Sequence, residues 1–229
     1  MKLATLALSV CATLPLTIAA QAAEIETVVV TASALPGTAI DPNQIPTNVQ
    51  TLSSADLSRL GSANALRTLS DSAAGVSLTE AQDNPFQPNL FYRGFEASPL
   101  AGDAQGLVVY ADGVRLNQPF GDVVNWDLLP DIAIDALTVE GSNPVFGLNA
   151  LGGAISVQMK NGFRWQGAEA EALGGSFGHA QTSLQYGQMD GASSLYVAAS
   201  VTNDDGWRDH SPSHVAQGFA DFGWRGHGA

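Results

Sequence analysis

The 229-residue chain has one cysteine, few basic side chains and no long apolar run beyond its N-terminus. Because Cys11 lies inside a predicted export leader, the mature chain can form neither a disulfide nor a thiolate metal site. Removing Lys2 with the leader leaves 8 basic against 22 acidic side chains, a net charge of −14, which argues against nucleic acid as a partner. No later segment reaches the roughly 18 apolar residues of a membrane-spanning helix. Helical spans are therefore excluded, but a β-barrel stays open because its strands carry a weaker signal.

The predicted leader occupies residues 1–22 and has the parts of a secretory signal peptide. Lys2 supplies the positive start, an apolar stretch runs from Leu3 to Ala19, and small residues follow at the cleavage site. No stop-transfer charges follow, which argues against a membrane anchor. We therefore predict an exported protein.

A short, strongly β-forming segment, E-T-V-V-V-T-A at residues 26–32, follows the leader directly. Three consecutive valines between threonines favour a strand, but residues 34–37 (A-L-P-G) break regular structure and no partner strand follows. An unpaired strand at a terminus can be captured by another protein through strand addition. We interpret residues 23–44 as a segment that holds this docking strand and a linker.

Residues 45–160 mix helix signals with strand signals, which predicts a compact α+β domain. Ser53 and Asp56 have the spacing of a capping box, which predicts a short helix, and a second helix is expected from Ser62. Asp112-Gly113 lies between two β-rich runs and predicts a two-residue hairpin turn. The other predicted elements are strands at 76–78, 90–93, 137–139 and 154–159, a short helix at 130–134, and loops at 81–89, 96–106 and 118–127.

Residues 163–229 are typical of about four strands and their turns. Each strand alternates in polarity over about 10 residues, and a tight turn at 190–191 contrasts with a long polar loop at 203–214. Outer-membrane barrels have this strand length and this contrast between loops. A soluble sandwich also alternates, but the loop asymmetry and the small outward side chains favour the first antiparallel strands of a transmembrane β-barrel. Since four strands cannot close a barrel, we expect the chain to be the N-terminal part of a longer protein.

Four motifs carry a resemblance to a known family: E-T-V-V-V-T-A (26–32), L-F-Y-R-G-F (90–95), V-V-Y-A-D-G-V-R-L-N (108–117) and N-P-V-F-G-L-N-A-L-G-G-A-I-S-V (143–157). With them, the chain from the leader to residue 229 resembles the TonB-dependent outer-membrane receptors. In that family an α+β plug with a mixed β-sheet fills a barrel of about 22 strands, and the periplasmic protein TonB captures an N-terminal box. The resemblance implies an outer-membrane location, with the plug in the barrel lumen, a periplasmic N-terminus, contact with membrane lipid and a monomer at full length.

The resemblance also assigns the residues that would bind TonB. They are six consecutive residues of the docking strand: Glu26, Thr27, Val28, Val29, Val30 and Thr31.

Five residues of the predicted α+β domain are candidates for ligand contact. Phe86, Phe120 and Trp126 lie in polar loops, where aromatic side chains often contact ligands, although they can equally pack against a barrel wall. Arg93 and Arg115 border the same loops and suit an acidic chelate or a phosphate. Structural pairing of these two arginines with plug or barrel carboxylates is the alternative.

The resemblance implies import of a scarce small-molecule or metal-chelate ligand, with a ferric siderophore as the leading expectation and cobalamin, saccharides or another chelate left open. Residues 140–144 (E-G-S-N-P) stand where many members carry Arg-Gly-Pro, which leaves the substrate class undecided. The alternative is a barrel-anchored adhesin or passive binding protein. We expect no enzyme activity, no cofactor and no metal site, because the glycine-rich stretch 147–153 fits no phosphate-binding loop and residues 204–210 lack EF-hand spacing.

Overall fold

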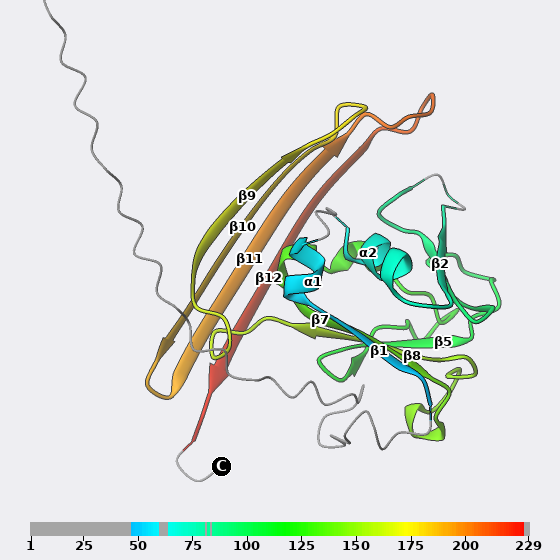
Figure 1. Ribbon diagram of the computed structural model, residues 1–229, viewed down its shortest axis with the longest axis horizontal. Helices are drawn as coiled ribbons and strands as arrows, with labels where there is room; N and C mark the ends of the chain where they lie inside the picture. Colours follow the sequence, from blue (N-terminus) through cyan, green and yellow to red (C-terminus); the bar gives the residue numbers. More distant parts are fainter. Residues whose placement is uncertain (1–46, 60–63, 81, 83, 227–229) are drawn as a thin grey trace, which may run out of the picture.

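A mixed α+β unit stands beside a long, curved antiparallel sheet (Figure 1). The computed structural model describes residues 47–59, 64–80, 82 and 84–226. We call the described residues from 47 to 160 the plug. The predicted leader and the predicted docking strand at 26–32 lie outside the described residues.

The central sheet of the plug is mixed, as expected for an α+β fold. Its strand order is β1-β7-β8-β5-β6, in which β5 and β8 run parallel and the other neighbours run antiparallel. The strands are β1 (Val49–Ser53), β5 (Leu107–Ala111), β6 (Val114–Arg115), β7 (Ile134–Gly141) and β8 (Gly153–Met159). Strand β1, for which the sequence analysis predicted no element, lies at one edge of the sheet.

Two short helices and a smaller sheet complete the plug. The helices are α1 (Ser54–Arg59) and α2 (Ala65–Ser72), and the smaller antiparallel sheet consists of β2 (Val76–Thr79), β3 (Asn89–Tyr92) and β4 (Phe95–Ala97). Three single-turn 3₁₀ helices are η2 (Trp126–Leu128), η3 (Asp131–Ala133) and η4 (Pro144–Phe146). No helix among the described residues is long and apolar enough to cross a membrane.

Local signals predicted the first helix and the hairpin correctly. The Ser53 N–H donates to Asp56 Oδ2 at 3.1 Å and the Asp56 N–H donates to Ser53 Oγ at 3.3 Å, so the capping box before α1 is confirmed. Asp112 and Gly113 both have positive φ, 46° and 78°, and join β5 to β6. Both central residues at positive φ are the mark of a two-residue hairpin turn, which confirms that prediction.

Three local predictions were wrong. Helix α2 begins at Ala65 rather than at Ser62, because the Asn64 side chain accepts the Arg67 N–H at 2.9 Å and caps the helix there. The expected loop 96–106 begins inside β4, a three-residue strand that pairs with β3. The helix expected at 130–134 is only the 3₁₀ turn η3.

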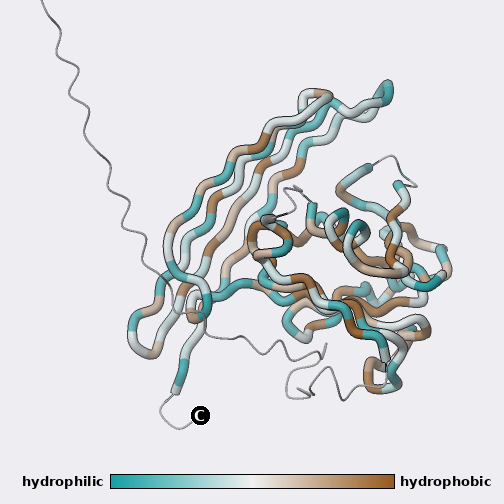
Figure 2. The backbone as a smooth tube through the Cα atoms, viewed as in Figure 1, coloured by the Kyte–Doolittle hydropathy of each residue, from teal (hydrophilic) through white to brown (hydrophobic). Residues whose placement is uncertain are grey.

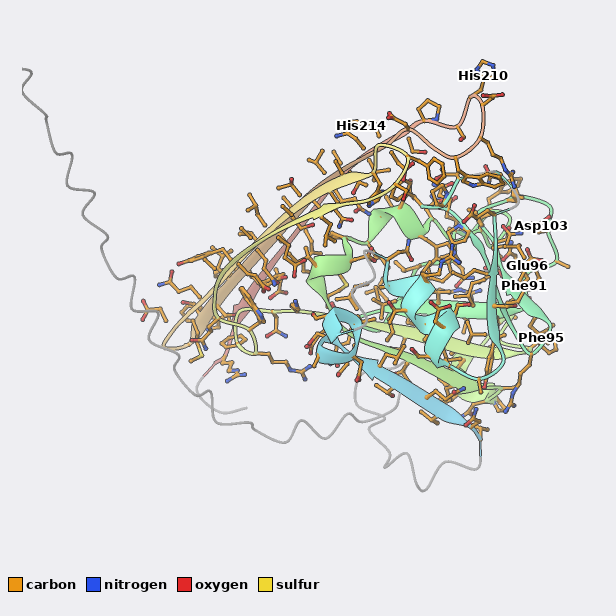
Figure 3. All side chains as sticks on the ribbon, turned by 45° about the horizontal axis from the view of Figure 1, so that its top comes forward. Phe91, Phe95, Glu96, Asp103, His210 and His214 are labelled. Carbon is orange, nitrogen blue, oxygen red and sulfur yellow. The ribbon has the colours of Figure 1, made fainter. Side chains whose placement is uncertain are left out.

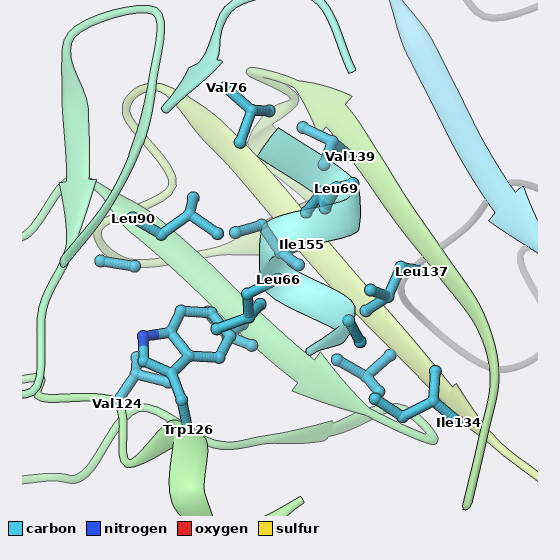
Figure 4. Packing of buried hydrophobic residues seen from close by; sticks show 14 of the residues in the cluster. Leu66, Leu69, Val76, Leu90, Val124, Trp126, Ile134, Leu137, Val139 and Ile155 are labelled. Carbon is cyan, nitrogen blue, oxygen red and sulfur yellow. The ribbon is translucent and has the colours of Figure 1, made fainter. Parts of the chain in front are cut away.

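The plug core lies between α2 and the central sheet. Figure 4 shows Leu66 and Leu69 of α2 facing Leu137, Val139 and Ile155 of the sheet. All five side chains are buried, and a fully buried aliphatic side chain stabilises a fold by roughly 1.5–3 kcal/mol. This packing holds α2, and therefore the loops around it, at one end of the plug.

The long sheet is a four-stranded antiparallel meander, which we call the barrel sheet. Its strands are β9 (Gly167–Gly174), β10 (Ala180–Asp190), β11 (Ser193–Asp204) and β12 (Ser213–Trp224), and each pairs with the next along the chain. A two-residue turn joins β10 to β11, and an eight-residue loop joins β11 to β12. Figure 2 shows hydropathy changing repeatedly along these strands.

The two faces of the barrel sheet differ in polarity. The buried face, toward the plug, carries mainly polar side chains: Ser183, Gln185, Ser194, Tyr196, Ser200 and Thr202. The outward face carries exposed apolar ones: Leu184, Tyr186, Leu195, Val197, Val201, Phe222 and Trp224. A soluble sandwich buries its apolar faces, whereas a transmembrane barrel turns them outward. The barrel sheet therefore has the polarity of the first strands of a transmembrane barrel.

Candidate ligand site and plug–sheet seam

One end of the barrel sheet carries the long connections. Outer-membrane barrels place short turns in the periplasm and longer loops outside, so we call the end of the sheet with the β11–β12 loop the outer end. His179 Nδ1 lies 2.8 Å from Asp204 Oδ2 and ties the β9–β10 loop to the end of β11. In Figure 3, His210 lies at the tip of the β11–β12 loop and His214 lies lower, at the start of β12.

A cavity of about 440 Å³ opens where this outer end meets the plug. It is lined by Asn64, Arg67, Leu78, Glu80, Pro85, Pro88 and Arg208. Arg67 lies 3.5 Å from Glu80, and the Arg208 guanidinium stacks 4.2 Å from the centre of the Trp207 ring. Guanidinium groups suit carboxylate and other oxyanion ligands because of their fork of donors. The cavity lining therefore carries two guanidinium groups, Arg67 from the plug and Arg208 from the β11–β12 loop, and one carboxylate, Glu80, which pairs with Arg67.

The five candidate residues predicted from the sequence lie in different places. Phe86 and Trp126 line one small cavity between the plug and the barrel sheet. Trp126 is 5% exposed and belongs to the plug core, whereas Phe120 is 88% exposed. Arg93 is exposed and stacks over the Tyr92 ring. Ligand contact by these residues stays a prediction.

Arg115 has a carboxylate partner within the plug. Its Nη2 donates to Asp122 Oδ1 at 2.7 Å, and both side chains are partly buried. The sequence left two roles open for Arg93 and Arg115: ligand contact, or pairing with a carboxylate. Arg115 makes such a pair.

Sequence reasoning missed Arg67 and Arg208 as candidates. Arg67 lies on a short helix and Arg208 lies in a loop more than 140 residues later, so no local pattern links them. Only the contact between the outer loop and the plug brings them to one cavity.

A second polar cluster lies on the side of the plug away from the barrel sheet (Figure 3). Asn89 Nδ2 donates to Glu96 Oε1 and, at 3.4 Å, to Asp103 Oδ2, and Ser98 Oγ donates to Asp103 Oδ2 at 2.8 Å. Burial, and then the Asp103 charge, raise the pKa of Glu96. Hydrogen bonds within the cluster account for its side chains, so we interpret it as structural.

Lys160 is the centre of the polar contacts that hold the plug to the barrel sheet. Its Nζ donates to the Ile132 carbonyl at 2.8 Å and to Gln185 Oε1 at 3.1 Å. The Tyr196 hydroxyl donates to the same Gln185 oxygen at 2.7 Å. Burial lowers the pKa of the Lys160 amine. Strands β10 and β11 thus bind the plug next to η3.

Asp131 of η3 sits between the plug and the barrel sheet, where two cavities share it as a lining residue. Burial raises the pKa of its carboxyl group to about 7, although a hydrogen bond from the Ala65 N–H acts in the opposite direction. The folded state therefore keeps a proton that an unfolded chain would release from about pH 4 upward.

Stability should therefore fall as pH rises from about 4 to about 7 and remain low above that range. Asp131→Asn keeps an acceptor for the Ala65 N–H and removes the charge. We expect this variant to be more stable than the wild type at pH 8, by on the order of 1 kcal/mol, and to match it at pH 4. Urea unfolding at the two pH values measures the difference. Asp71→Asn, at an exposed position of α2, is the control, and an identical pH profile for Asp131→Asn would contradict the burial argument.

The plug and the polarity of the barrel sheet together define a class, the plugged transmembrane β-barrel. Residues 41–154, about half of the chain, match the family described as TonB-dependent Receptor Plug Domain. No curated protein sequence matches the chain. The chain belongs to the TonB-dependent receptor family, which comprises receptors and transporters rather than enzymes.

Solved structures share the fold at low sequence identity. The pyoverdine outer membrane receptor FpvA from Pseudomonas aeruginosa PAO1 is 16% identical over 77% of this chain and 25% of its own, with a TM-score of 0.56. The Ferric-Catecholate import receptor Fiu from E. coli K12 is 19% identical over 70% of this chain and 22% of its own, with a TM-score of 0.52. The copper transporter OprC is 17% identical over 71% of this chain and 26% of its own, with a TM-score of 0.53. The chain thus spans about a quarter of the length of these proteins.

Proposed function

We propose that the protein is an outer-membrane receptor that imports a scarce chelate, a ferric siderophore or a similar compound, with energy transmitted by TonB. The observation that carries this proposal is the plug, because its family is one of TonB-dependent receptors. The apolar outward face of the barrel sheet supports a location in the outer membrane, with lipid against that face. We place the plug in the lumen of a monomeric barrel.

The outer cavity supports an anionic chelate as the ligand class. Arg67 and Arg208 bring two cationic groups to its lining, in a chain whose net charge is strongly negative. An acidic surface repels anions in general, so a local pair of guanidinium groups is the feature that would hold one. Two of the structural neighbours are named for pyoverdine and ferric-catecholate ligands and a third for copper. These names are consistent with a siderophore or another metal chelate as the ligand.

The energy step in this proposal uses the docking strand, residues 26–31. About 17 residues separate it from β1, and an extended chain of that length reaches at most about 60 Å. The strand can therefore extend well into the periplasm while β1 stays paired with β7. Strand β1 is an edge strand of the plug sheet, so a pull on the N-terminal segment acts first on the β1–β7 pairing.

Deletion of residues 26–31 tests the proposal against a passive adhesin or binding protein. We expect the deletion to abolish energy-dependent uptake of a radiolabelled ferric siderophore and to leave binding at the cell surface unchanged. The control is an equal deletion in the linker, residues 38–43, which should support uptake. Wild-type uptake without residues 26–31 would remove the TonB-coupled mechanism and favour passive binding.

A further inference from the structure

Strand β1 and helix α1 form one continuous unit of the plug. Ser53 is the last residue of β1 and Ser54 is the first residue of α1, so no loop separates the two elements. The Ser53 N–H and hydroxyl both donate to Asp56 Oδ2, at 3.1 and 2.7 Å, and the Asp56 N–H donates back to Ser53 Oγ at 3.3 Å. A displacement of β1 therefore carries the start of α1 with it.

Few contacts hold this unit to the rest of the plug. Strand β1 lies at the edge of the central sheet and pairs with β7 alone. The Gln50 side chain exchanges two exposed hydrogen bonds with the Ala74 backbone, at 3.0 and 2.7 Å. Leu52 and Leu57 pack against the plug core but are only partly buried. Because bonds to water replace exposed hydrogen bonds at little cost, the β1–β7 pairing is the main contact that must break.

Helix α2 lies beyond the end of this unit and is held much more firmly. Four of its side chains are buried: Ala65, Leu66, Thr68 and Leu69. No described side chain of α1 is buried. A pull that displaces β1 and α1 therefore meets the plug core at α2.

Helix α1 forms one wall of a cavity of about 310 Å³ between the plug and the barrel sheet, which we call the α1 cavity. Figures 1 and 3 both show α1 on the side of the plug that faces the barrel sheet. The lining includes Ser54, Leu57 and Ser58 of α1, Ile132 of η3, and Glu169 and Glu171 of β9. Removal of α1 would therefore take away one wall of the α1 cavity.

The 3₁₀ turn η3 forms a fixed wall of the same cavity. The Lys160 N–H donates to the Ala133 carbonyl at 2.7 Å, and Lys160 Nζ donates to the Ile132 carbonyl at 2.8 Å. The Tyr196 hydroxyl of β11 lies 3.4 Å from the same Ile132 oxygen. None of these bonds involves β1 or α1, so η3 stays on the barrel sheet when the unit leaves.

We propose that β1 and α1 are displaced together and that α1 is the movable wall of the α1 cavity, so that a pull on the N-terminal segment opens the plug beside strands β9 and β10. The inference rests on the proposed function for the origin of the pull. It specifies which part of the plug moves, which part stays and on which side the opening forms. Asp131, Lys160 and Glu169 line this side, and such charged groups suit the passage of a hydrophilic solute.

Distances between spin labels test the movement without TonB and without a ligand. Labels at Ser58→Cys and Glu171→Cys span the cavity from α1, and labels at Ile132→Cys and Glu171→Cys span it from η3. Gln50→Pro weakens β1, because proline disturbs the pairing with Val139 and the bonds of the Gln50 amide are lost. In the full-length receptor, this change should lengthen the first distance by on the order of 10 Å, one helix diameter, and leave the second unchanged.

Ser77→Pro is the matched control for the spin-label experiment. It places proline in β2, an edge strand of the smaller sheet, and should change neither distance. An unchanged Ser58–Glu171 distance in Gln50→Pro would overturn the movable wall. Equal shifts of both distances would overturn it as well, because they would show that η3 moves with α1.

A reversible cross-link tests the same movement in transport. A bis-methanethiosulfonate bridge between Ser58→Cys and Glu171→Cys should slow uptake of a radiolabelled ferric siderophore by energised cells at least about tenfold, because it blocks a movement that transport requires. Cleavage of the bridge by a reducing agent should restore uptake. The same bridge between Ile132→Cys and Glu171→Cys should leave uptake close to that of the unbridged receptor.

The outcomes separate this inference from the proposed function. Equal uptake by the two bridged receptors would overturn the movable wall and leave TonB-coupled import intact. Wild-type uptake after deletion of residues 26–31 would overturn both, because no pull would then act on β1.

Discussion

Replacement of Val29 by proline is expected to abolish TonB-coupled uptake while the receptor still folds and inserts into the membrane. Val29 is the central residue of the docking strand. Proline removes its backbone N–H and fixes φ, so a strand pairing that uses this residue loses a hydrogen bond and its extended geometry. If the loss approaches the roughly 3 kcal/mol that proline costs inside regular structure, affinity for TonB falls about 100-fold.

The measurement is energy-dependent uptake of a labelled ferric siderophore, with surface binding and the amount of receptor in the outer membrane recorded in parallel. Val29→Ile keeps the N–H and the strand preference and is the matched control, with uptake close to that of the wild type. Uptake at wild-type level in Val29→Pro would contradict strand pairing at this position. A receptor missing from the membrane would instead contradict our view that residues 23–44 lie outside the folded domains.

Gly153→Ala is expected to have the largest effect on stability of any single-methyl change in the plug. Gly153 opens β8 at φ +145°, where it pairs with Leu107 on one side and Gly141 on the other. A Cβ at this position would overlap the carbonyl oxygen of Glu140 in β7, which belongs to the backbone and cannot rotate away. Clash and backbone strain together should cost about 3–5 kcal/mol.

Gly147→Ala is the matched control for this prediction. Gly147 also has positive φ, 77°, but a Cβ there would meet nothing within 4 Å. Only the backbone conformation, φ 77° and ψ −149°, then penalises alanine, by about 1–3 kcal/mol. Urea unfolding of residues 45–160 can be followed by the fluorescence of Trp126, the single tryptophan of that segment. Equal losses in the two variants would show that the overlap with Glu140 is relieved by a small shift of the sheet.

Several elements of the fold could be predicted from the sequence because their signals are local. Ser53 and Asp56 are three residues apart and satisfy each other's backbone donors, so the capping box holds in any tertiary context. Asp112-Gly113 needs only two residues that tolerate positive φ. Strand β4 was missed because its three residues owe their strand geometry to pairing with β3, and pairing partners leave no local pattern. The second helix was expected from Ser62, but the Asn64 side chain caps α2 two residues later.

The candidate site was less predictable than the fold. Composition singled out Phe86, Phe120 and Trp126 as aromatic residues in polar loops, yet their exposures range from buried to almost fully exposed. Whether an aromatic side chain in a loop packs inward or faces solvent depends on the elements that cover it. Arg67 and Arg208 meet at one cavity only because the outer loop of the barrel sheet lies over the plug.

The sequence by itself determined the hairpin and the two-residue alternation of the last four strands, and it predicts an export leader and a docking strand, which lie outside the described residues. Each of these features depends either on residues adjacent in the chain or on a repeating polarity pattern, and both kinds of signal lie within a single segment of sequence. The tertiary structure alone decided the order β1-β7-β8-β5-β6, the direction in which the polar face of the barrel sheet points, and the cavities between the plug and the barrel sheet. An alternating pattern shows that the two faces of a strand differ, but only packing against the plug decides which face is buried, because that choice depends on contacts between residues far apart in the chain.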